Sequence, residues 1–305
     1  MTSERELTAR LRAFFPQRAD VRVGVGDDAA VVGARASHVA LCCDPVIEGV
    51  HFLPETPLEL VGRKAVNRNL SDLAATGADA DWLLVSVVVP RSWQAAQLMR
   101  LLRGVRSAAL AAGAVVVGGD LAVADAPLVV TVTAAGNVRG RALLRSDLRV
   151  GDTLHVTGPL GGSIDGHHLK FRPHVCEGRW LAAQRAVGGA MDVSDGLALD
   201  LATMLEASGV PGAELDAAAL PVRAAARRLA KGDRDGALQR ALHDGEDHVL
   251  LFSVRRGAAL SRGGPLTARA RRPIGRVVAE PGLRLRRAGA LEDLDRRGFE
   301  HEVGR

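Results

Sequence analysis

The stretch Asn67-Arg68-Asn69-Leu70-Ser71-Asp72-Leu73-Ala74-Ala75-Thr76-Gly77-Ala78-Asp79 decides how the rest of the chain is interpreted. Apolar residues recur through it with a helical period, at positions 61, 65, 66, 70, 73 and 74. Asn69, Asp72 and Thr76 stand at i, i+3 and i+7, so they share one face of that helix. This pattern predicts a packed helix that presents one carboxylate to a cleft. Taken alone, the polar row also fits ordinary solvated positions, which are the commoner case.

Other carboxylates come after short β-like runs that end in Gly or another small residue. They are Asp27-Asp28 after VRVGVG, Asp44 after VALCC, Asp120 after AVVVGG, and Asp192 and Asp195 in AMDVSDG. In open α/β folds, ligands bind outside the carboxyl ends of the strands. Carboxylates at such positions predict a hard, oxygen-rich site for Mg²⁺, completed by water and substrate phosphates.

Length and composition set the broad class of the protein. The chain has 305 residues, enough for two domains, with 47% hydrophobic and 25% charged residues, as in ordinary globular proteins. No apolar run reaches the roughly 18 residues of a membrane span. The N-terminus carries two Glu and no long apolar region, so it does not resemble a secretory signal. Three cysteines, two of them adjacent, do not make a disulfide framework. We therefore expect a reduced, cytoplasmic protein with no membrane partner.

The basic residues are nearly all arginine and are concentrated late in the chain. The formal net charge is +5. Such a balance suits nucleic-acid binding or, alternatively, a solvated surface around an anion site. Tyr is absent and only 3% of the residues are aromatic, so few side chains could stack on bases. We expect no nucleic-acid partner.

The periodicity predicts α/β architecture in two domains, residues 1–140 and 141–305. In the first we expect helices at 3–15, about 58–77 and 92–112, and strands at 21–25, 29–33, 38–43, 81–89, 114–117 and 127–138, with 44–57 as a loop. In the second we expect strands at 152–157, 189–194, 247–254 and 273–279, helices at 175–187, 195–208 and 264–270, and a Gly-rich loop at 158–163. The tail 281–305 has no clear pattern.

The sequence lacks several standard catalytic motifs. The pattern G-x-x-x-x-G-K-[ST] is absent, and Gly24-Val25-Gly26 or the 158–162 cluster alone is more often a simple turn. Neither zinc-ligand spacing nor a G-x-S-x-G elbow occurs, and His167, His168 and His174 lack acidic partners at metal spacing. A nucleotide triphosphate would therefore need Asp-held Mg²⁺ and an arginine to neutralise its charge.

Seven segments together resemble the thiamine-monophosphate kinase family. They are GVGDDAAVV (24–32), DPVIEGVHF (44–52), NLSDLAATGADADWLLVSVVVP (69–90), GGDLA (118–122), GRALLRSDLRVGDTLHVTG (140–158), DVSDGLALDL (192–201) and DGEDHVLLF (244–252). The similarity runs from about residue 24 to 280. The wider superfamily includes aminoimidazole ribonucleotide synthetase and selenophosphate synthetase.

The resemblance implies a two-domain aminoimidazole ribonucleotide synthetase-like fold, with an N-terminal mixed sheet covered by helices and a C-terminal α/β domain. Residues 1–140 would bind ATP and Mg²⁺ and form a homodimer through the sheet, and residues 141–305 would complete the nucleotide and substrate site. The reaction would transfer the γ-phosphoryl group of ATP to thiamine monophosphate, giving thiamine diphosphate and ADP.

The resemblance also assigns residues by motif position. The implied metal ligands are Asp28, Cys43 through its carbonyl, Asp44, Asp72, Asp120, Asp192 and Asp195. The implied ATP contacts are Gly119, Asp120, Arg145 and Ser194, and the implied substrate residues are His51, Glu246 and Arg296. Asp72, Asp120 and Arg145 would act in catalysis. Each has an ordinary alternative as a turn, helix-capping or surface residue; their order and spacing together favour the functional role.

The chain departs from the family pattern at three places. Cys42-Cys43 stands where the family has hydroxyl residues, and soft thiols suit Mg²⁺ poorly, so we expect a weakened metal position. Arg296 stands where an aromatic residue would stack on thiamine, with Phe299 nearby as a substitute. The stretch between Gly158 and Met191 is short for the family. Two alternatives remain open, a sister ATP-dependent synthetase and a non-catalytic nucleotide-binding relative.

Overall fold

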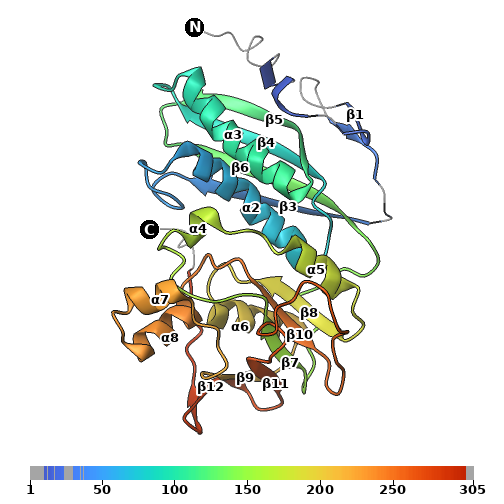
Figure 1. The fold of residues 1–305 in the computed structure, drawn as a ribbon, viewed down its shortest axis with the longest axis vertical. Coiled ribbons are helices and arrows are strands. Elements are labelled where there is room, and N and C mark those ends of the chain that lie inside the picture. Colours follow the sequence, from blue (N-terminus) through green and yellow to red (C-terminus); the bar gives the residue numbers. More distant parts are fainter. Residues whose placement is uncertain are drawn as a thin grey trace. The chain divides into compact units, whose positions relative to one another are not determined.

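The computed structural model describes residues 10–11, 13–16, 18–23, 30–34, 36 and 38–299. The chain forms two compact units, Met1–Leu73 with Ala78–Arg139, and Ala74–Gly77 with Gly140–Arg305 (Figure 1). The main division therefore lies between Arg139 and Gly140.

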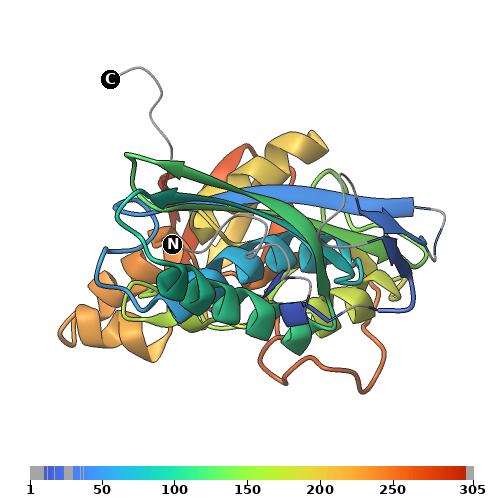
Figure 2. The same ribbon diagram turned by 90° about the horizontal axis from the view of Figure 1, so that it is seen from above.

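The described part of the first unit contains a four-stranded sheet with strand order β3-β6-β4-β5. β3 and β4 each pair antiparallel with β6, and β4 pairs parallel with β5. The strands are β3 (His38–Ile47), β4 (Trp82–Pro90), β5 (Val115–Ala124) and β6 (Val129–Val138). Helices α2 (Leu58–Thr76) and α3 (Ala95–Ala112) lie against one face of this sheet (Figure 2). A short antiparallel pair, β1 (Val21–Val23) and β2 (Val31–Val32), precedes it.

The apolar stripe predicted for the central helix is confirmed, because all of its members are buried in α2. They are Val61, Ala65, Val66, Leu70, Leu73 and Ala74. Two glycines let α2 and α3 approach closely. A Cβ at Gly62 would lie 2.2 Å from the Leu101 carbonyl oxygen, and one at Gly104 would lie 2.0 Å from the Glu59 carbonyl oxygen. These contacts fix the first turns of α2 against α3.

Asp44 and Asp120 lie inside strands, so the expectation that they follow strand ends is wrong. β3 continues through Pro45 to Ile47, and β5 continues to Ala124. Within the part of the chain that the structure describes, both are edge strands with a ladder partner on one side only. An edge strand such as β3 tolerates a proline whose missing N–H faces away from the ladder. Gly118 and Gly119 do not end β5, which continues past them to Ala124.

In residues 140–299, seven strands form one sheet with order β13-β12-β9-β11-β7-β10-β8. The strands are β7 (Thr153–Val156), β8 (Val187–Asp192), β9 (Gly212–Asp216), β10 (Leu250–Val254), β11 (Gly275–Val278), β12 (Gly282–Arg287) and β13 (Ala290–Asp293). The helices are α4 (His167–Lys170), α5 (Val175–Ala182), α6 (Leu197–Ser208), α7 (Ala224–Leu229) and α8 (Arg234–His243). One core cluster joins α6 and α8 to the sheet, and another gathers around Leu181 and Phe252.

The α/β class and the arrangement of helices on a mixed sheet are confirmed, while some elements of the second unit differ from expectation. Residues 264–270 form turns and no helix, because the Gly263-Gly264-Pro265 run breaks the pattern. The tail without a clear pattern forms the β12–β13 hairpin. No helix in the described ranges has both the length and the apolar content needed to cross a membrane.

Candidate functional site

In the first unit, α2 places Asp72 on the same side of the sheet as Asp44 of β3. Asn69, one turn before Asp72, links the two elements: its Oδ1 accepts the Asp44 N–H at 3.0 Å, and its Nδ2 donates to the Ala65 carbonyl at 3.0 Å. The Asp44 carboxylate lies 3.9 Å from Arg68 Nε, too far for a hydrogen bond. This carboxylate is about one-third exposed, so it can still bind a ligand from solution.

The thiol of Cys42 lies close enough to both Asp72 and Asp44 for their charges to affect it. Burial raises the pKa of Cys42, and the negative charges of Asp72 and then Asp44 raise it further. The thiol donates to the Asn69 carbonyl at 3.2 Å. The sulfur therefore stays protonated at neutral pH, and the anionic groups here are carboxylates and not a soft thiolate.

Cys43 and Asp120 have their side chains on the opposite face of the same sheet. Thr133 Oγ1 donates to Cys43 Sγ at 3.3 Å. Asp120 pairs in register with Ser86, which pairs in turn with Thr131, and these three residues line a hollow of about 580 Å³. The structure thus brings Asp44 and Asp72 together and separates their side chains from that of Asp120. Asp28, the remaining expected ligand of this unit, lies outside the described residues.

Gly119 and His51 are both tightly held. A Cβ at Gly119 would lie 1.9 Å from the Val85 carbonyl oxygen, so only glycine fits beside β4. His51 follows β3 in a turn where its Nδ1 accepts the Ile47 N–H at 3.0 Å. The fully buried Lys64 donates its ammonium to the His51 carbonyl at 2.5 Å.

In the second unit, the turn Asp192–Gly196 is organised by Asp200 from the first turns of α6. Asp200 Oδ2 accepts the N–H groups of Ser194 at 3.0 Å, Asp195 at 3.1 Å and Gly196 at 3.2 Å. Burial, followed by the charges of Asp195 and Asp192, raises the pKa of Asp200 to about 8, although the N–H groups of Asp195 and Gly196 oppose the shift. Asp192 and Asp195 therefore lie close enough to act on Asp200, and a cation bound by these two carboxylates would relieve the repulsion.

The segment 244–248 lies against this turn in a strained conformation. Glu246 has φ +60° and His248 has φ +49°, the left-handed region that costs most side chains about 1–2 kcal/mol. Their N–H groups donate to the carbonyls of Ser194 at 2.6 Å and Val193 at 2.8 Å. Strain of this kind persists only where surrounding contacts impose it, and it concentrates at functional sites.

Asp247 supplies that constraint by joining the segment to the Gly-rich loop. Its fully buried carboxylate pairs with Arg223 Nη2 at 2.7 Å and accepts the Gly161 N–H at 2.7 Å. Arg223 also donates to the Pro159 carbonyl at 2.6 Å. Burial raises the pKa of Asp247 to about 6, and the Arg223 guanidinium opposes that shift. The loop and Glu246 are therefore held by one buried ion pair.

Asp192 lies beside a buried histidine. Its carboxylate lies 3.3 Å from His248 Nδ1, with both side chains about 3% exposed. The His248 ring stacks on Phe171 with centroids 4.1 Å apart. These contacts fix the Asp192 carboxylate beside the strained segment.

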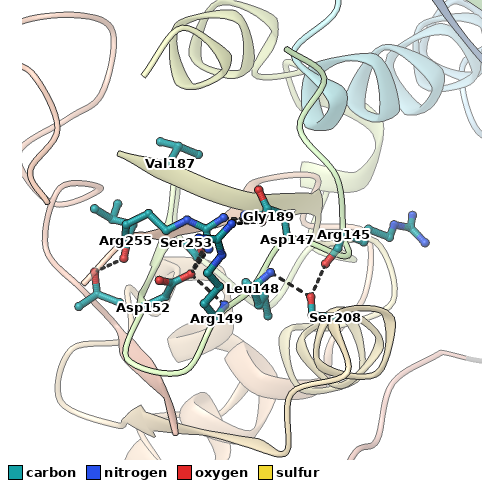
Figure 3. A network of polar contacts seen from close by, with 12 residues as sticks. Arg145, Asp147, Leu148, Arg149, Asp152, Val187, Gly189, Ser208, Ser253 and Arg255 are labelled. Atoms are coloured by element: carbon teal, nitrogen blue, oxygen red, sulfur yellow. Dashed lines mark hydrogen bonds and ion pairs between the residues drawn. The ribbon is translucent and has the colours of Figure 1, made fainter. Parts of the chain in front are cut away.

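Three residues expected to bind nucleotide or substrate lie nearer the surface. The carbonyl of Arg145 accepts from Ser208 Oγ at 3.0 Å, and its exposed guanidinium extends away from that contact (Figure 3). Arg296 pairs with Glu206 at 2.7 Å, and its stacking on thiamine stays a prediction. The Phe299 N–H donates to the Asp195 carbonyl at 2.9 Å, which places this aromatic residue beside the acidic turn.

The carboxylates of the two units are the kind of ligand that Mg²⁺ prefers. Among the described residues, no three His, Cys, Asp or Glu side chains are grouped so that they could hold a metal ion. Mg²⁺ nevertheless needs only one or two carboxylates, with water and phosphate oxygens filling its shell. Asp44 with Asp72, beside a protonated thiol, has that composition, and so does Asp192 with Asp195. The residues fit a hard divalent cation.

Several residues that organise the site were not among the predicted ligands or substrate contacts. Asn69 belonged to the predicted polar row, so its position gave a usable signal. Asp200 and Asp247 follow assigned acids within a few residues, but their burial depends on contacts made elsewhere. The pairing of Arg223 with Asp247 leaves no mark on the local pattern.

Comparison with known proteins gives consistent results. Residues 26–138 match the N-terminal domain of AIR synthase related proteins. A thiamine-monophosphate kinase of Rhodopirellula baltica is 37% identical, with 98% of this chain and 97% of the relative covered. A solved thiamine-monophosphate kinase of Stenotrophomonas maltophilia K279a is 32% identical with a TM-score of 0.77, covering 90% of this chain and 93% of that one. A structure described as AaThiL complexed with AMPPCP and TMP is 26% identical with a TM-score of 0.77, covering 98% and 97%.

Proposed function

Because this chain belongs to the thiamine-monophosphate kinase family, we propose that it transfers the γ-phosphoryl group of ATP to thiamine monophosphate, giving thiamine diphosphate and ADP. The observation that carries the proposal is the 37% identity to a curated kinase over 98% of the chain. A neighbour of the same fold has been solved with AMPPCP and TMP, which supports these two kinds of substrate.

The first unit contributes carboxylates to this reaction. When bound, Mg²⁺ neutralises charge on the phosphate oxygens and so favours transfer. Asp44 and Asp72 would hold it, and Asn69 orients Asp44 through the β3 backbone. Asp120 would be a further Mg²⁺ ligand by motif position, although its side chain lies on the sheet face opposite Asp44. Asp28 stays a proposed ligand by motif position.

The second unit contributes binding and orientation. Asp192 and Asp195 would hold a cation, and Asp200 fixes the Ser194 backbone from which an ATP contact is proposed. The Arg223–Asp247 pair would keep Glu246 in its strained conformation toward substrate, and Arg145 would contact ATP. In this proposal the protein positions the two substrates for in-line displacement and does no covalent chemistry itself.

The direct test is to incubate purified protein with ATP, Mg²⁺ and thiamine monophosphate and to follow thiamine diphosphate by chromatography. We expect product to form in step with ADP. A parallel panel of other phosphorylated and amidine substrates separates a sister synthetase from this activity. ATP binding without turnover on any substrate would reject the proposal and favour a non-catalytic relative.

We also propose that the protein is a homodimer formed through the helix-free face of the β3–β6 sheet. Large apolar side chains are exposed on this face, including Leu41 at 71% and Leu84 at 42%. Analytical ultracentrifugation should give twice the chain mass, and Leu41→Arg should shift it toward the monomer. A monomeric wild type at micromolar concentration contradicts this part of the proposal alone.

A further inference from the structure

Five arginines surround a cavity of about 650 Å³ in the second unit, at the ends of β7, β8 and β10. Its charged lining consists of Arg141, Arg149, Arg185, Arg255 and Arg256, with Asp147 and Asp152. Figure 3 shows the polar network that forms one wall of this cavity. None of these residues belongs to the carboxylate sites described above.

Both carboxylates of the cavity are already used by the protein. Asp152 is buried, pairs with Arg255 Nη1 at 2.8 Å and accepts the Arg149 N–H at 3.1 Å. Asp147 pairs with Arg255, and with Arg141 at 3.4 Å. These pairs orient the guanidinium groups and do not leave an acidic site for a cation.

Glycines make room for the arginine side chains. A Cβ at Gly188 would lie 2.8 Å from Cζ of Arg255, and a Cβ at Gly151 would lie 2.9 Å from Cδ of Arg256. Arg141 is anchored separately, since its Nη2 donates to the Val187 carbonyl at 2.8 Å. The backbone therefore seats the guanidinium groups of Arg255 and Arg141 and the aliphatic stem of Arg256.

The charge of the cavity is not balanced by its own lining. Five arginines against two aspartates leave a formal charge of +3. Within the described residues, Arg185 and Arg256 have no ion-pair partner, whereas Arg255 and Arg141 do. Guanidinium groups bind phosphate oxygens through paired N–H donors, and several of them together suit a group with more than one phosphate.

We propose that this cavity binds a diphosphate group as a second anion site, separate from the carboxylate sites. A diphosphate ester carries about −3 near pH 7, since its terminal phosphate alone holds roughly −1.5 to −2, and this balances the lining. The volume lies within the roughly 300–1,000 Å³ of small-molecule sites. The Arg145 side chain, proposed to contact ATP, points away from the network (Figure 3).

The two sites differ in their need for metal, which makes the proposal testable without turnover. The carboxylate sites need a divalent cation to hold phosphate, with Arg145 as the proposed arginine contact there, whereas the arginines of the cavity bind phosphate directly. Inorganic pyrophosphate is therefore titrated into the full-length protein in excess EDTA by isothermal calorimetry. We expect one binding event that weakens as salt is raised, and weaker binding of orthophosphate.

The matched variants are R185E/R256E in the cavity and R227E/R234E on α7 and α8, all four arginines being exposed in the same unit. The cavity pair should lose at least about tenfold in affinity, because two charges reverse, while the control pair stays near wild type. R185Q/R256Q, with its unfolding midpoint measured, provides a milder variant that preserves the fold.

Further titrations in EDTA with ADP and with thiamine diphosphate distinguish a nucleotide from the proposed product as the source of the diphosphate. Tighter binding of either one than of pyrophosphate identifies the source and supports the site. The absence of pyrophosphate binding to the wild type overturns the proposal, and so does equal loss in both variant pairs. Neither result bears on whether the chain phosphorylates thiamine monophosphate.

Discussion

Acidic residues are stabilised differently in the two units of the molecule. In the first, Asp44 and Asp72 lie beside a protonated thiol, and the guanidinium of Arg68 is 3.9 Å from Asp44. In the second, the fully buried Asp247 forms an ion pair with Arg223, and Asp200 accepts hydrogen bonds from three backbone N–H groups. A carboxylate that stays partly exposed, as Asp44 does, can bind an ion from solution, whereas carboxylates satisfied inside the protein maintain its structure. We therefore expect mutation of the first group to lower activity and mutation of the second group to lower stability.

The largest expected effect is on catalysis, from Asp72→Asn in the first unit. Removing this carboxylate should lower kcat/KM by about a thousandfold, equivalent to about 4 kcal/mol of transition-state stabilisation. Stability should change little, because asparagine preserves the size and shape of the side chain. Steady-state kinetics at several Mg²⁺ concentrations and denaturant unfolding measure the two effects.

Asp125→Asn is the control for that variant, since Asp125 lies in the same unit with an 82% exposed side chain. It should leave both activity and stability unchanged. Near-normal turnover by the Asp72→Asn protein would mean that Asp72 does not hold the catalytic metal.

The next effect is on stability, from Asp247→Asn in the second unit. Removing one partner of a buried ion pair typically costs about 3 kcal/mol or more, because the other charge is left without compensation. Arg223 keeps its carbonyl acceptors, so we expect a loss of about 3 kcal/mol in the free energy of unfolding. KM for thiamine monophosphate should rise more than kcat falls, since Glu246 loses its support.

Asp165→Asn provides the comparison for that change, because Asp165 also pairs with an arginine, Arg228, but with side chains 40% and 66% exposed. Exposed pairs contribute little, so a change below about 0.5 kcal/mol is expected. If the two variants lose equal stability, the buried pair has no special structural role.

The contrast between the units also explains what the sequence could predict. The period of α2 and the apolar run of β4 are local patterns, and both elements occur where they were expected. The lengths of β3 and β5 depend on their neighbours in the sheet, so Asp44 and Asp120 were wrongly placed after strand ends. The proximity of Asp44 to Asp72 could be anticipated from motif order. The pairing of Asp247 with Arg223 could not, because it depends on how the Gly-rich loop folds back onto the segment 244–248.

A smaller effect is expected from pH, through His155 in the buried part of the second unit. Burial lowers the pKa of His155 to about 4, and its Nδ1 lies 3.3 Å from the Ala270 carbonyl. The unfolded chain binds a proton near pH 6.5 and the folded chain does not, so stability falls as pH drops from about 6.5 toward 4. This histidine should account for about 2 kcal/mol lost between pH 7 and pH 5.

Urea unfolding of the wild type and His155→Gln at both pH values isolates that contribution. The variant is expected to be less stable at pH 7 through lost packing on Phe252, yet to lose about 2 kcal/mol less on acidification. Identical pH dependence in the two proteins would show that His155 is charged in the folded state.

The smallest effect concerns the adjacent cysteines, which face opposite sides of β3. Cys42 lies beside Asp72, so Cys42→Ser would place a hard oxygen donor next to the carboxylate pair. The Mg²⁺ concentration for half-maximal activity should fall by about threefold, on the order of 0.6 kcal/mol. Cys43→Ser should change it by less than about twofold, because the Cys43 side chain contacts Thr133 on the other face. A larger effect at Cys43 would mean that the face bearing Asp120 binds the catalytic metal, and the pairing of Asp44 with Asp72 would lose its proposed role.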